Sequence, residues 1–142
     1  FLLYVRARLV RKARPEDFPG IRKLAGALGL DYPGMEKARS WLAEKDGRVL
    51  GIVSLLVHAD SRELVSLGVD PAAREKGLGG RLIETAVAAA GADVYLATVI
   101  PGYFERHGFA RTLRVPRGMA KDPAWCAGCD KSRCAVMVRE KS

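Results

Sequence analysis

The stretch from Leu64 to Ala90 limits the fold more than any other part of the chain. It opens with leucine and valine residues that suit a buried strand, and Asp70-Pro71 ends that strand because proline cannot donate to a sheet ladder. It closes with apolar residues at helical spacing, namely Leu78, Leu82, Ile83, Ala86 and Ala90. The sequence therefore predicts a strand, a short turn and an amphipathic helix in immediate succession.

The turn between that strand and helix has the composition of an anion-binding site. It runs Arg74-Glu75-Lys76-Gly77-Leu78-Gly79-Gly80 and leads into Arg81. Glycines let backbone N–H groups approach a ligand closely, and the cationic side chains add positive charge. The free N–H groups of the helix, and the positive end of its dipole, point back at the turn. We expect a pyrophosphate to bind there.

Two commoner glycine-rich motifs do not fit this turn. A dinucleotide fingerprint needs a third glycine at the position of Leu82, and a nucleoside-triphosphate loop needs Gly-Lys-Ser/Thr where the chain has Gly79-Gly80-Arg81. One structural alternative stays open, a helix that simply begins after a flexible turn, because glycine-rich loops recur widely.

The pattern that remains is V-x-P-x-x-R-x-x-G-x-G, formed by Val69, Pro71, Arg74, Gly77 and Gly79. It resembles the acyl-CoA-binding motif of the GNAT family of N-acetyltransferases. A second match, Y-F-E-R-H-G-F at residues 103–109, follows at the right distance, and the resemblance covers most of residues 5–114. It implies an α/β (α+β) fold with a mixed, mostly antiparallel, twisted sheet flanked by helices, and acetyl-CoA as the cosubstrate.

Hydrophobic patterning predicts the other elements. The expected order is a half-exposed strand (5–13), a helix beginning between Pro15 and Gly20, a helical turn (35–40), a hairpin (41–45 and 49–57) turning at Asp46-Gly47-Arg48, a strand (62–69), the helix after the glycine-rich turn, a strand (92–98), a short helix (101–107) ended by Gly108, and a last strand (135–139).

Length and composition indicate one globular domain. The chain has 142 residues, of which 49% are hydrophobic and 28% charged. We expect a single domain over residues 1–142, with residues 1–4 as candidates for non-native or disordered sequence because the chain lacks an initial methionine. No apolar run reaches membrane-spanning length, and Phe1-Leu2-Leu3-Tyr4 is too short for a signal peptide. We expect a cytoplasmic protein without a membrane partner.

The net charge of +8 does not by itself indicate nucleic-acid binding, because the basic residues are scattered with little aromatic interleaving. A polyanionic small ligand accounts for part of the charge. Two alternatives to an enzyme remain open, a non-catalytic acyl-CoA sensor and a basic nucleic-acid-binding module. A homodimer is also left open.

Glu63 is the best-placed candidate base, since it begins the strand that leads to the glycine-rich turn. The alternative is a solvated carboxylate at a strand end, and strand parity does not decide because a bulge would exchange the two faces. The resemblance implies backbone contacts of Leu67–Val69 with the pantetheine amides and thioester oxygen. The implied cofactor residues are Leu67, Gly68, Val69, Arg74, Glu75, Lys76, Gly77, Leu78, Gly79, Gly80, Arg81 and Phe104.

Many family members place a tyrosine just before the glutamate of the short helix, where it is proposed to protonate the leaving thiolate. This chain has Phe104 at that position. Tyr103 is the remaining candidate acid, although it lies about 100° around the helix from Phe104. A thiol with a pKa of about 8.5 leaves as a thiolate near neutral pH without a strong acid.

A narrower resemblance concerns small N-acetylglutamate-synthase-like members of the family. It rests on E-L-x-S-L-x-V-x-P (63–71), P-x-x-F-E-x-x-G-F (101–109), and a tail with Trp125, Cys126, Cys129 and Cys134. It implies a small-molecule amine as substrate, with an amino acid such as glutamate favoured. An α-carboxylate would need an arginine or lysine clamp, which spacing does not identify. Tyr32, Trp41 and residues 30–39 are expected to wall the acceptor pocket.

The three cysteines lie close together, between Cys126 and Cys134. An odd number in one short segment argues against a secreted disulfide framework and favours reduced thiols. Zinc would need a fourth ligand, and neither histidine stands at a motif spacing, so no metal is expected.

Overall fold

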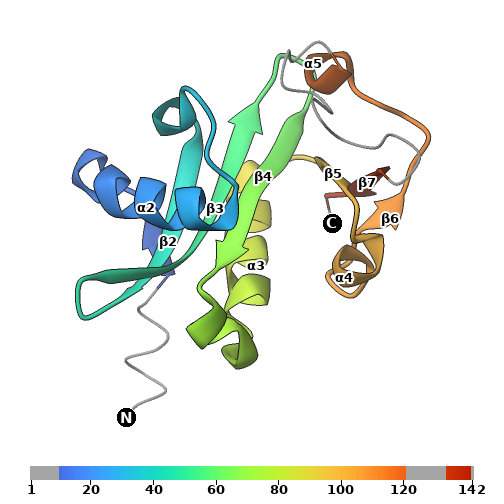
Figure 1. Cartoon of the computed structure of the whole chain (residues 1–142). Coiled ribbons are helices and arrows are strands. Elements are labelled where there is room, and N and C mark those ends of the chain that lie inside the picture. Colours follow the sequence, from blue (N-terminus) through green and yellow to red (C-terminus); the bar gives the residue numbers. More distant parts are fainter. Residues whose placement is uncertain (1–9, 121–133, 142) are drawn as a thin grey trace.

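The protein is described here from a computed structural model, which covers residues 10–120 and 134–141. Its described strands form a seven-stranded sheet in the order β1-β2-β3-β4-β5-β7-β6 (Figure 1). Only the β4–β5 pair is parallel. The bounds are β1 Val10–Lys12, β2 Arg39–Lys45, β3 Arg48–Val57, β4 Arg62–Val69, β5 Val94–Thr98, β6 Ala110–Arg111 and β7 Ala135–Arg139. The mixed, mostly antiparallel sheet is confirmed.

Helices connect the strands on both faces of the sheet. The 3-10 helices are η1 Pro15–Asp17, η2 Met35–Lys37 and η3 Pro71–Lys76, and the α-helices are α2 Phe18–Leu28, α3 Leu78–Ala90, α4 Pro101–Glu105 and α5 Arg117–Ala120. No helix within the described ranges is long and apolar enough to cross a membrane.

Two hydrophobic cores sandwich the sheet, because side chains alternate between the faces of a strand. Trp41, Val53 and Leu55 pack with the apolar stripe of α3. Leu42 and Ile52, which point the other way, pack with α2. The two long helices therefore cover opposite faces of the sheet (Figure 1).

The predicted hairpin forms between β2 and β3, with a turn one residue shorter than expected because Arg48 belongs to β3. Lys45 pairs with Arg48, which leaves Asp46 and Gly47 as a two-residue turn. Both turn residues have positive φ, 53° and 75°. That is the type I′ geometry whose twist matches the flanking strands, and Asp-Gly is one of the pairs that adopts it most readily.

Several boundaries differ from the sequence predictions. Residues 71–76 form η3, a wound 3-10 helix, where a looser turn was expected, because Asp70 accepts a hydrogen bond from the Ala72 N–H at 3.0 Å and caps the segment. β2 begins at Arg39 and β5 at Val94, where the sequence predicted strands from residues 41 and 92. The short helix α4 ends at Glu105, before the predicted residue 107. β6 and α5 were not predicted. Residues 5–9 of the first predicted strand lie outside the described ranges.

An ion pair fastens the start of α2 to the sheet edge. Arg11 on β1 donates two hydrogen bonds to Asp17, at 2.7 and 2.9 Å, and Asp17 also accepts from the backbone N–H of Arg14. The hydrogen bonds from Arg11 lower the pKa of Asp17 from 3.8 to about 2. The charged carboxylate is therefore favoured in the folded state.

Asp17→Asn should destabilise the fold by about 2 kcal/mol at pH 7, the free energy that corresponds to the lowered pKa. Because the folded pKa is depressed, this contribution is complete above the unfolded value and is lost as the pH falls from about 4 to about 2. Urea titrations of both proteins from pH 7 to pH 2 would measure it. Asp31→Asn, at an exposed pair with Arg22, is the matched control and should change stability by less than about 0.5 kcal/mol. A constant difference between wild type and Asp17→Asn over this pH range would contradict the assignment.

Candidate functional site

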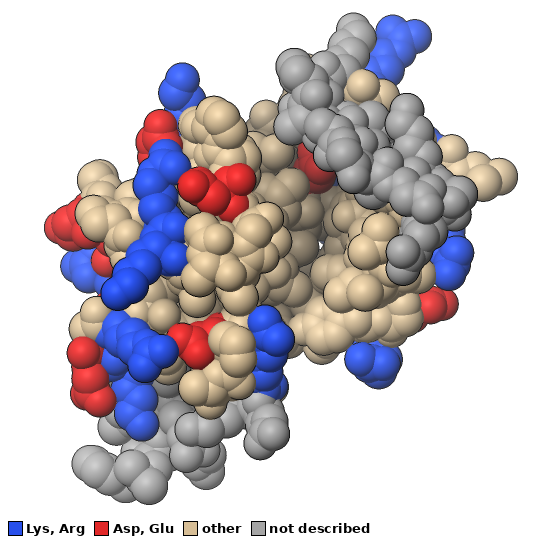
Figure 2. Space-filling model, in the orientation of Figure 1, with Lys and Arg blue, Asp and Glu red and all other residues tan. Residues whose placement is uncertain are grey.

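The central feature of the site is the separation of β4 from β5. The two strands pair only at Arg62 with Val94 and at Glu63 with Tyr95. Beyond those residues they diverge, so the edge of β4 that faces β5 has no strand partner in the described part of the chain. Figure 2 shows the surface hollowed next to β4. Glu63 and Tyr95 lie at the vertex of this V-shaped opening, where the two strands last touch.

A bulge in β4 redirects its side chains inside the opening. Ile52 pairs with Gly68 and Ser54 with Val65, so two residues of β4 oppose one residue of β3. Ser66, one of the two, has φ 53°, and its hydroxyl donates to the Leu30 carbonyl at 3.1 Å. The bulge exchanges the two faces of β4. The sequence alone could not tell whether such a bulge was present.

The consequence for Glu63 is a defined side of the sheet. Leu64 and Val69, on either side of the bulge, both pack in the α3 core although their parity differs. Glu63 alternates with Leu64 and therefore faces away from α3. The whole residue is 8% exposed, so Glu63 is not a freely solvated carboxylate at a strand end.

The open end of the V meets the N-terminus of α3. Gly77 caps this helix with φ 69°, and no atom would touch a Cβ added there. The first hydrogen bond back to the cap runs from the Arg81 N–H to the Gly77 carbonyl, so the N–H groups of residues 78–80 precede the helical ladder. An open left-handed glycine, followed by N–H groups that precede the helical ladder, fits a pyrophosphate.

Gly79 and Gly80 lie in the first turn of α3, and packing against neighbouring side chains also requires glycine at both positions. A Cβ at Gly79 would lie 2.5 Å from the Tyr103 hydroxyl oxygen, and a Cβ at Gly80 would lie 2.9 Å from Cε1 of His107. These glycines let the α4 segment approach α3. Their lack of a side chain serves helix packing, whereas Gly77 alone borders open space.

The cationic residues of the turn are placed as follows. The Nε of Arg74 donates to the Val69 carbonyl at 2.9 Å, so this arginine satisfies a backbone acceptor at the end of β4. Arg81 is partly buried on α3. The side chains of Glu75 and Lys76 lie outside the described part of the structure.

Tyr103 and Phe104 point in different directions from α4. Phe104 is 7% exposed and packs edge-on against Phe109, so most of its ring belongs to the core. Tyr103 reaches Gly79 beside Val69, at the open end of the V. Glu63 lies at the other end of β4, roughly 20 Å away at the rise of an extended strand. The two predicted catalytic residues are thus not brought together.

Burial raises the pKa of Tyr103 above its usual value of 10, although the nearby Arg106 guanidinium acts in the opposite direction. The hydroxyl therefore keeps its proton at neutral pH and remains a hydrogen-bond donor. This hydroxyl lies beside Gly79, in the first turn of α3.

His58 is a site residue that sequence reasoning missed. Its Nε2 lies 2.8 Å from Oε1 of Glu63, and the two side chains are 16% and 11% exposed. The β3–β4 connection is tight, with Val57 opposite Arg62 and the His58 N–H bonded to the Ser61 carbonyl at 2.9 Å. A hairpin reading of residues 49–69 would have placed His58 beside Glu63, and that was the available signal.

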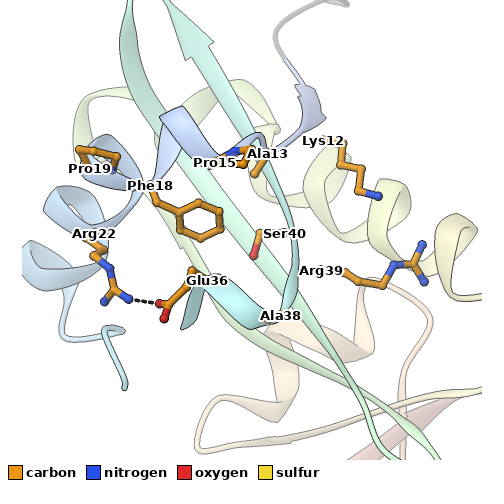
Figure 3. A pocket seen from close by; sticks show the side chains of 10 residues that line it. All are labelled: Lys12, Ala13, Pro15, Phe18, Pro19, Arg22, Glu36, Ala38, Arg39 and Ser40. Atoms are coloured by element: carbon orange, nitrogen blue, oxygen red, sulfur yellow. Dashed lines mark hydrogen bonds and ion pairs between the residues drawn. The ribbon is translucent and has the colours of Figure 1, made fainter. Parts of the chain in front are cut away.

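Two residues predicted to wall the acceptor pocket, Trp41 and Tyr32, pack in the cores on opposite faces of the sheet. Trp41 is wrong, because it is 5% exposed on the α3 side with the Arg39 guanidinium over its ring. Tyr32 packs against the α2 core. The loop before β2 instead borders a separate cavity of about 810 Å³ between α2 and the β1–β2 edge, in which Phe18 faces the Arg22–Glu36 ion pair and Arg39 points away (Figure 3).

A family model for an acetyltransferase (GNAT) domain matches residues 36–111, which is more than half of the chain and includes the opening between β4 and β5. The chain belongs to the GNAT family. This is a family of N-acetyltransferases, and acetyl-CoA is its typical cosubstrate. The left-handed cap at Gly77 and the N–H groups at the start of α3 fit that cosubstrate's pyrophosphate.

Solved GNAT structures share the fold at low sequence identity. Rv2747 from Mycobacterium tuberculosis, solved with CoA and NLQ, is 23% identical with a TM-score of 0.74, over 94% of this chain and 99% of that one. N-acetylglutamate synthase from Neisseria gonorrhoeae, solved with CoA and N-acetyl-glutamate, is 23% identical with a TM-score of 0.76, over 92% of this chain and 34% of that one.

A curated relative matches more closely over a shorter stretch. It is a mycothiol acetyltransferase from Nocardia farcinica, 42% identical over 67 residues. The match takes in 46% of this chain and only 22% of that relative's length.

Of the predicted tail, Cys134 is partly buried before β7, whereas Trp125, Cys126 and Cys129 lie outside the described residues.

Proposed function

We propose that this GNAT domain transfers the acetyl group of acetyl-CoA to the amine of a small molecule, with an α-amino acid such as glutamate as the favoured acceptor. The observation that carries the proposal is the opening between β4 and β5. An anion-binding helix end lies at its open end and a nearly buried glutamate lies at its vertex.

In this proposal different parts of the opening bind different parts of the cosubstrate. The N–H groups of residues 78–80 would hold the pyrophosphate, with the Tyr103 hydroxyl as a further donor nearby. The free backbone edge at Leu67, Gly68 and Val69 would bond the pantetheine amides, as an exposed strand edge does for other extended ligands. The cosubstrate would supply an acetyl thioester. We assign Tyr103 to this binding role because of its distance from the vertex.

Glu63 would act at the acceptor side of the sheet. An amine must lose a proton to form an amide, and a group that receives this proton contributes typically about 10²- to 10⁴-fold to the rate. Glu63 faces away from α3, at the residue where β4 and β5 last pair. The thioester would lie in the opening beside it.

Arg114 supports an acceptor that carries a carboxylate. Its guanidinium lies 5.9 Å from the ring centroid of Tyr95, the strand partner of Glu63. By contrast, the cations over α2 on the visible face are interleaved with acids (Figure 2), and Arg22 pairs with Asp31 and Glu36. A guanidinium stacked on a ring matches the planar geometry of a carboxylate, so we propose Arg114 as the clamp.

Thiol release from acetyl-CoA with a panel of amines would test this function. The panel should hold glutamate, glutamine, other α-amino acids, simple amines without a carboxylate, and a lysine-containing peptide. We expect saturable turnover of an α-amino acid, and Arg114→Gln should raise its KM about tenfold or more, whereas Arg111→Gln on exposed β6 should not. CoA binding without turnover of any amine would favour the sensor instead. Rapid acetylation of the peptide alone would contradict the acceptor class.

The mycothiol acetyltransferase and N-acetylglutamate synthase relatives are consistent with a small-molecule amine. A cytoplasmic location, a homodimer and a single domain over the whole of residues 1–142 stay predictions.

A further inference from the structure

We propose that His58 and Glu63 form one proton-accepting pair, in which the imidazole of His58 takes the proton of the acceptor amine and the carboxylate of Glu63 orients the ring. This inference rests on the proposed acetyltransferase function and assigns the base within it. It concerns a residue outside the motifs that carry the family resemblance.

The first argument is the geometry of the pair. A distance of 2.8 Å between Nε2 and Oε1 is that of a charge-assisted hydrogen bond. With Nε2 as the donor, Nδ1 keeps a lone pair for a second partner. Both side chains are largely buried yet neither is sealed, since His58 is 16% and Glu63 11% exposed. A proton donor from outside the fold can therefore reach the pair.

The second argument is that the His58 side chain is also held by α5, at its Cβ and Cγ. The carboxylate of Asp60 accepts the backbone N–H groups of Arg117 at 2.9 Å and Gly118 at 3.2 Å, which fastens α5 over the β3–β4 connection. A Cβ at Gly118 would overlap the Cβ of His58 and lie 2.7 Å from its Cγ. The glycine thus lets α5 pack directly against the base of the histidine side chain.

The charged and titratable groups around His58 have defined positions. Glu63 on β4 contacts the ring, and Asp60 binds the start of α5. Arg62 turns its guanidinium to the carbonyls of His58 and Ser61, at 3.4 and 3.3 Å. Tyr95 on β5 is the strand partner of Glu63 and lies under Arg114. Among the described groups, the carboxylate in direct contact with the imidazole is that of Glu63.

The third argument is chemical. An ordinary imidazole, with a pKa near 6.5, is a stronger base than an ordinary carboxylate near 4.3, and so accepts a proton more readily at neutral pH. In the step, the amine lone pair forms the C–N bond to the acetyl carbon while the C–S bond breaks and its electron pair goes to sulfur. The amine proton passes to Nδ1 of His58, directly or through one water. The resulting imidazolium is stabilised by the carboxylate of Glu63, as in other carboxylate–histidine pairs.

The test compares His58→Gln, Glu63→Gln and the double variant, using acetyl-CoA and the panel amine that wild type acetylates fastest. We expect each single variant to lower kcat/KM about 100-fold or more, and the double variant to lose little beyond the worse single variant, because the residues act as a unit. CoA affinity by calorimetry should stay within about twofold of wild type in all three. Glu84→Gln is the matched control, because Glu84 is an exposed carboxylate on α3 that pairs with Arg139 of β7, and it should keep wild-type kinetics.

The pH dependence of kcat/KM separates a proton-accepting role from a structural one. His58→Gln should abolish the fall in rate on the acid side, whereas a purely structural role of His58 would leave that fall in place. Activity of His58→Gln within about threefold of wild type, or an unchanged acid limb, would overturn the pair. So would additive losses in the double variant. A wild type that binds CoA but acetylates no panel amine would instead refute the proposed function.

Discussion

Gly77→Asp should weaken CoA binding about 100- to 200-fold. The substitution adds a carboxylate at the open cap of α3, where no described atom beyond the chain neighbours of Gly77 lies within 4 Å of the new Cβ, so the carboxylate has room beside the bound pyrophosphate. Two like charges about 5 Å apart repel by roughly 3 kcal/mol at the effective dielectric of a protein surface. Isothermal titration calorimetry with CoA would measure the change.

Two controls separate charge from backbone strain in that experiment. Gly77→Asn has nearly the same shape and the same left-handed backbone requirement without the charge, and it should lose less than about fivefold in affinity. Gly91 caps the other end of α3 with a similar φ of 63° and equally open space. Gly91→Asp should therefore leave CoA affinity unchanged. Equal losses in all three variants would show that the pyrophosphate does not bind at Gly77.

Leu82→Ala should lower the free energy of unfolding by about 3 kcal/mol, which corresponds to roughly 10 °C in Tm for a chain of this size. Leu82 is fully buried in the core between α3 and the sheet. Its Cδ1 would lie 2.8 Å from a Cβ added at Gly51 on β3. Gly51→Ala alone should consequently cost about 1–2 kcal/mol through overpacking.

The two changes are complementary, so their combination tests the contact between α3 and β3 directly. A methyl group at position 51 fills part of the cavity that Leu82→Ala leaves, and the double variant should be more stable than the sum of the single effects by about 1 kcal/mol. Gly26→Ala, whose Cβ would meet nothing within 4 Å, is the matched control and should be neutral or slightly stabilising. Strict additivity in chemical denaturation would mean that α3 packs elsewhere on the sheet.

Elements whose signals are local were predicted closely. β4 spans the predicted residues 62–69, α3 begins at Leu78 where the apolar spacing begins, and β7 spans the predicted 135–139. Gly108 ends the α4 segment with φ 84°, the left-handed geometry expected of a residue after a helix. Asp46-Gly47 likewise encodes its own turn. In each case the residue that sets the geometry lies within a few positions of the element that it shapes.

Features that depend on distant partners were not predicted. The sequence permitted two orientations for Glu63, and the bulge at Ser66 decided between them through pairing with β3 and a hydrogen bond to Leu30. Gly79 and Gly80 looked like part of a phosphate loop, yet their missing side chains accommodate Tyr103 of α4 and His107 just after it, more than twenty positions later in the chain. These contacts cannot be predicted from the residues next to Gly79 and Gly80 in the sequence.

The amino-acid sequence by itself therefore determined the family, the fold class and the strand–turn–helix at residues 64–90, because backbone conformation and amphipathic spacing are properties of neighbouring residues. Only the tertiary structure decided what stands beside Glu63. His58 reaches it because the β3–β4 connection is tight and α5 is fastened to Asp60, residues that belong to separate parts of the chain. A side-chain pair of this kind depends on the tertiary fold, because its 2.8 Å separation requires both the strand register and the packing of α5.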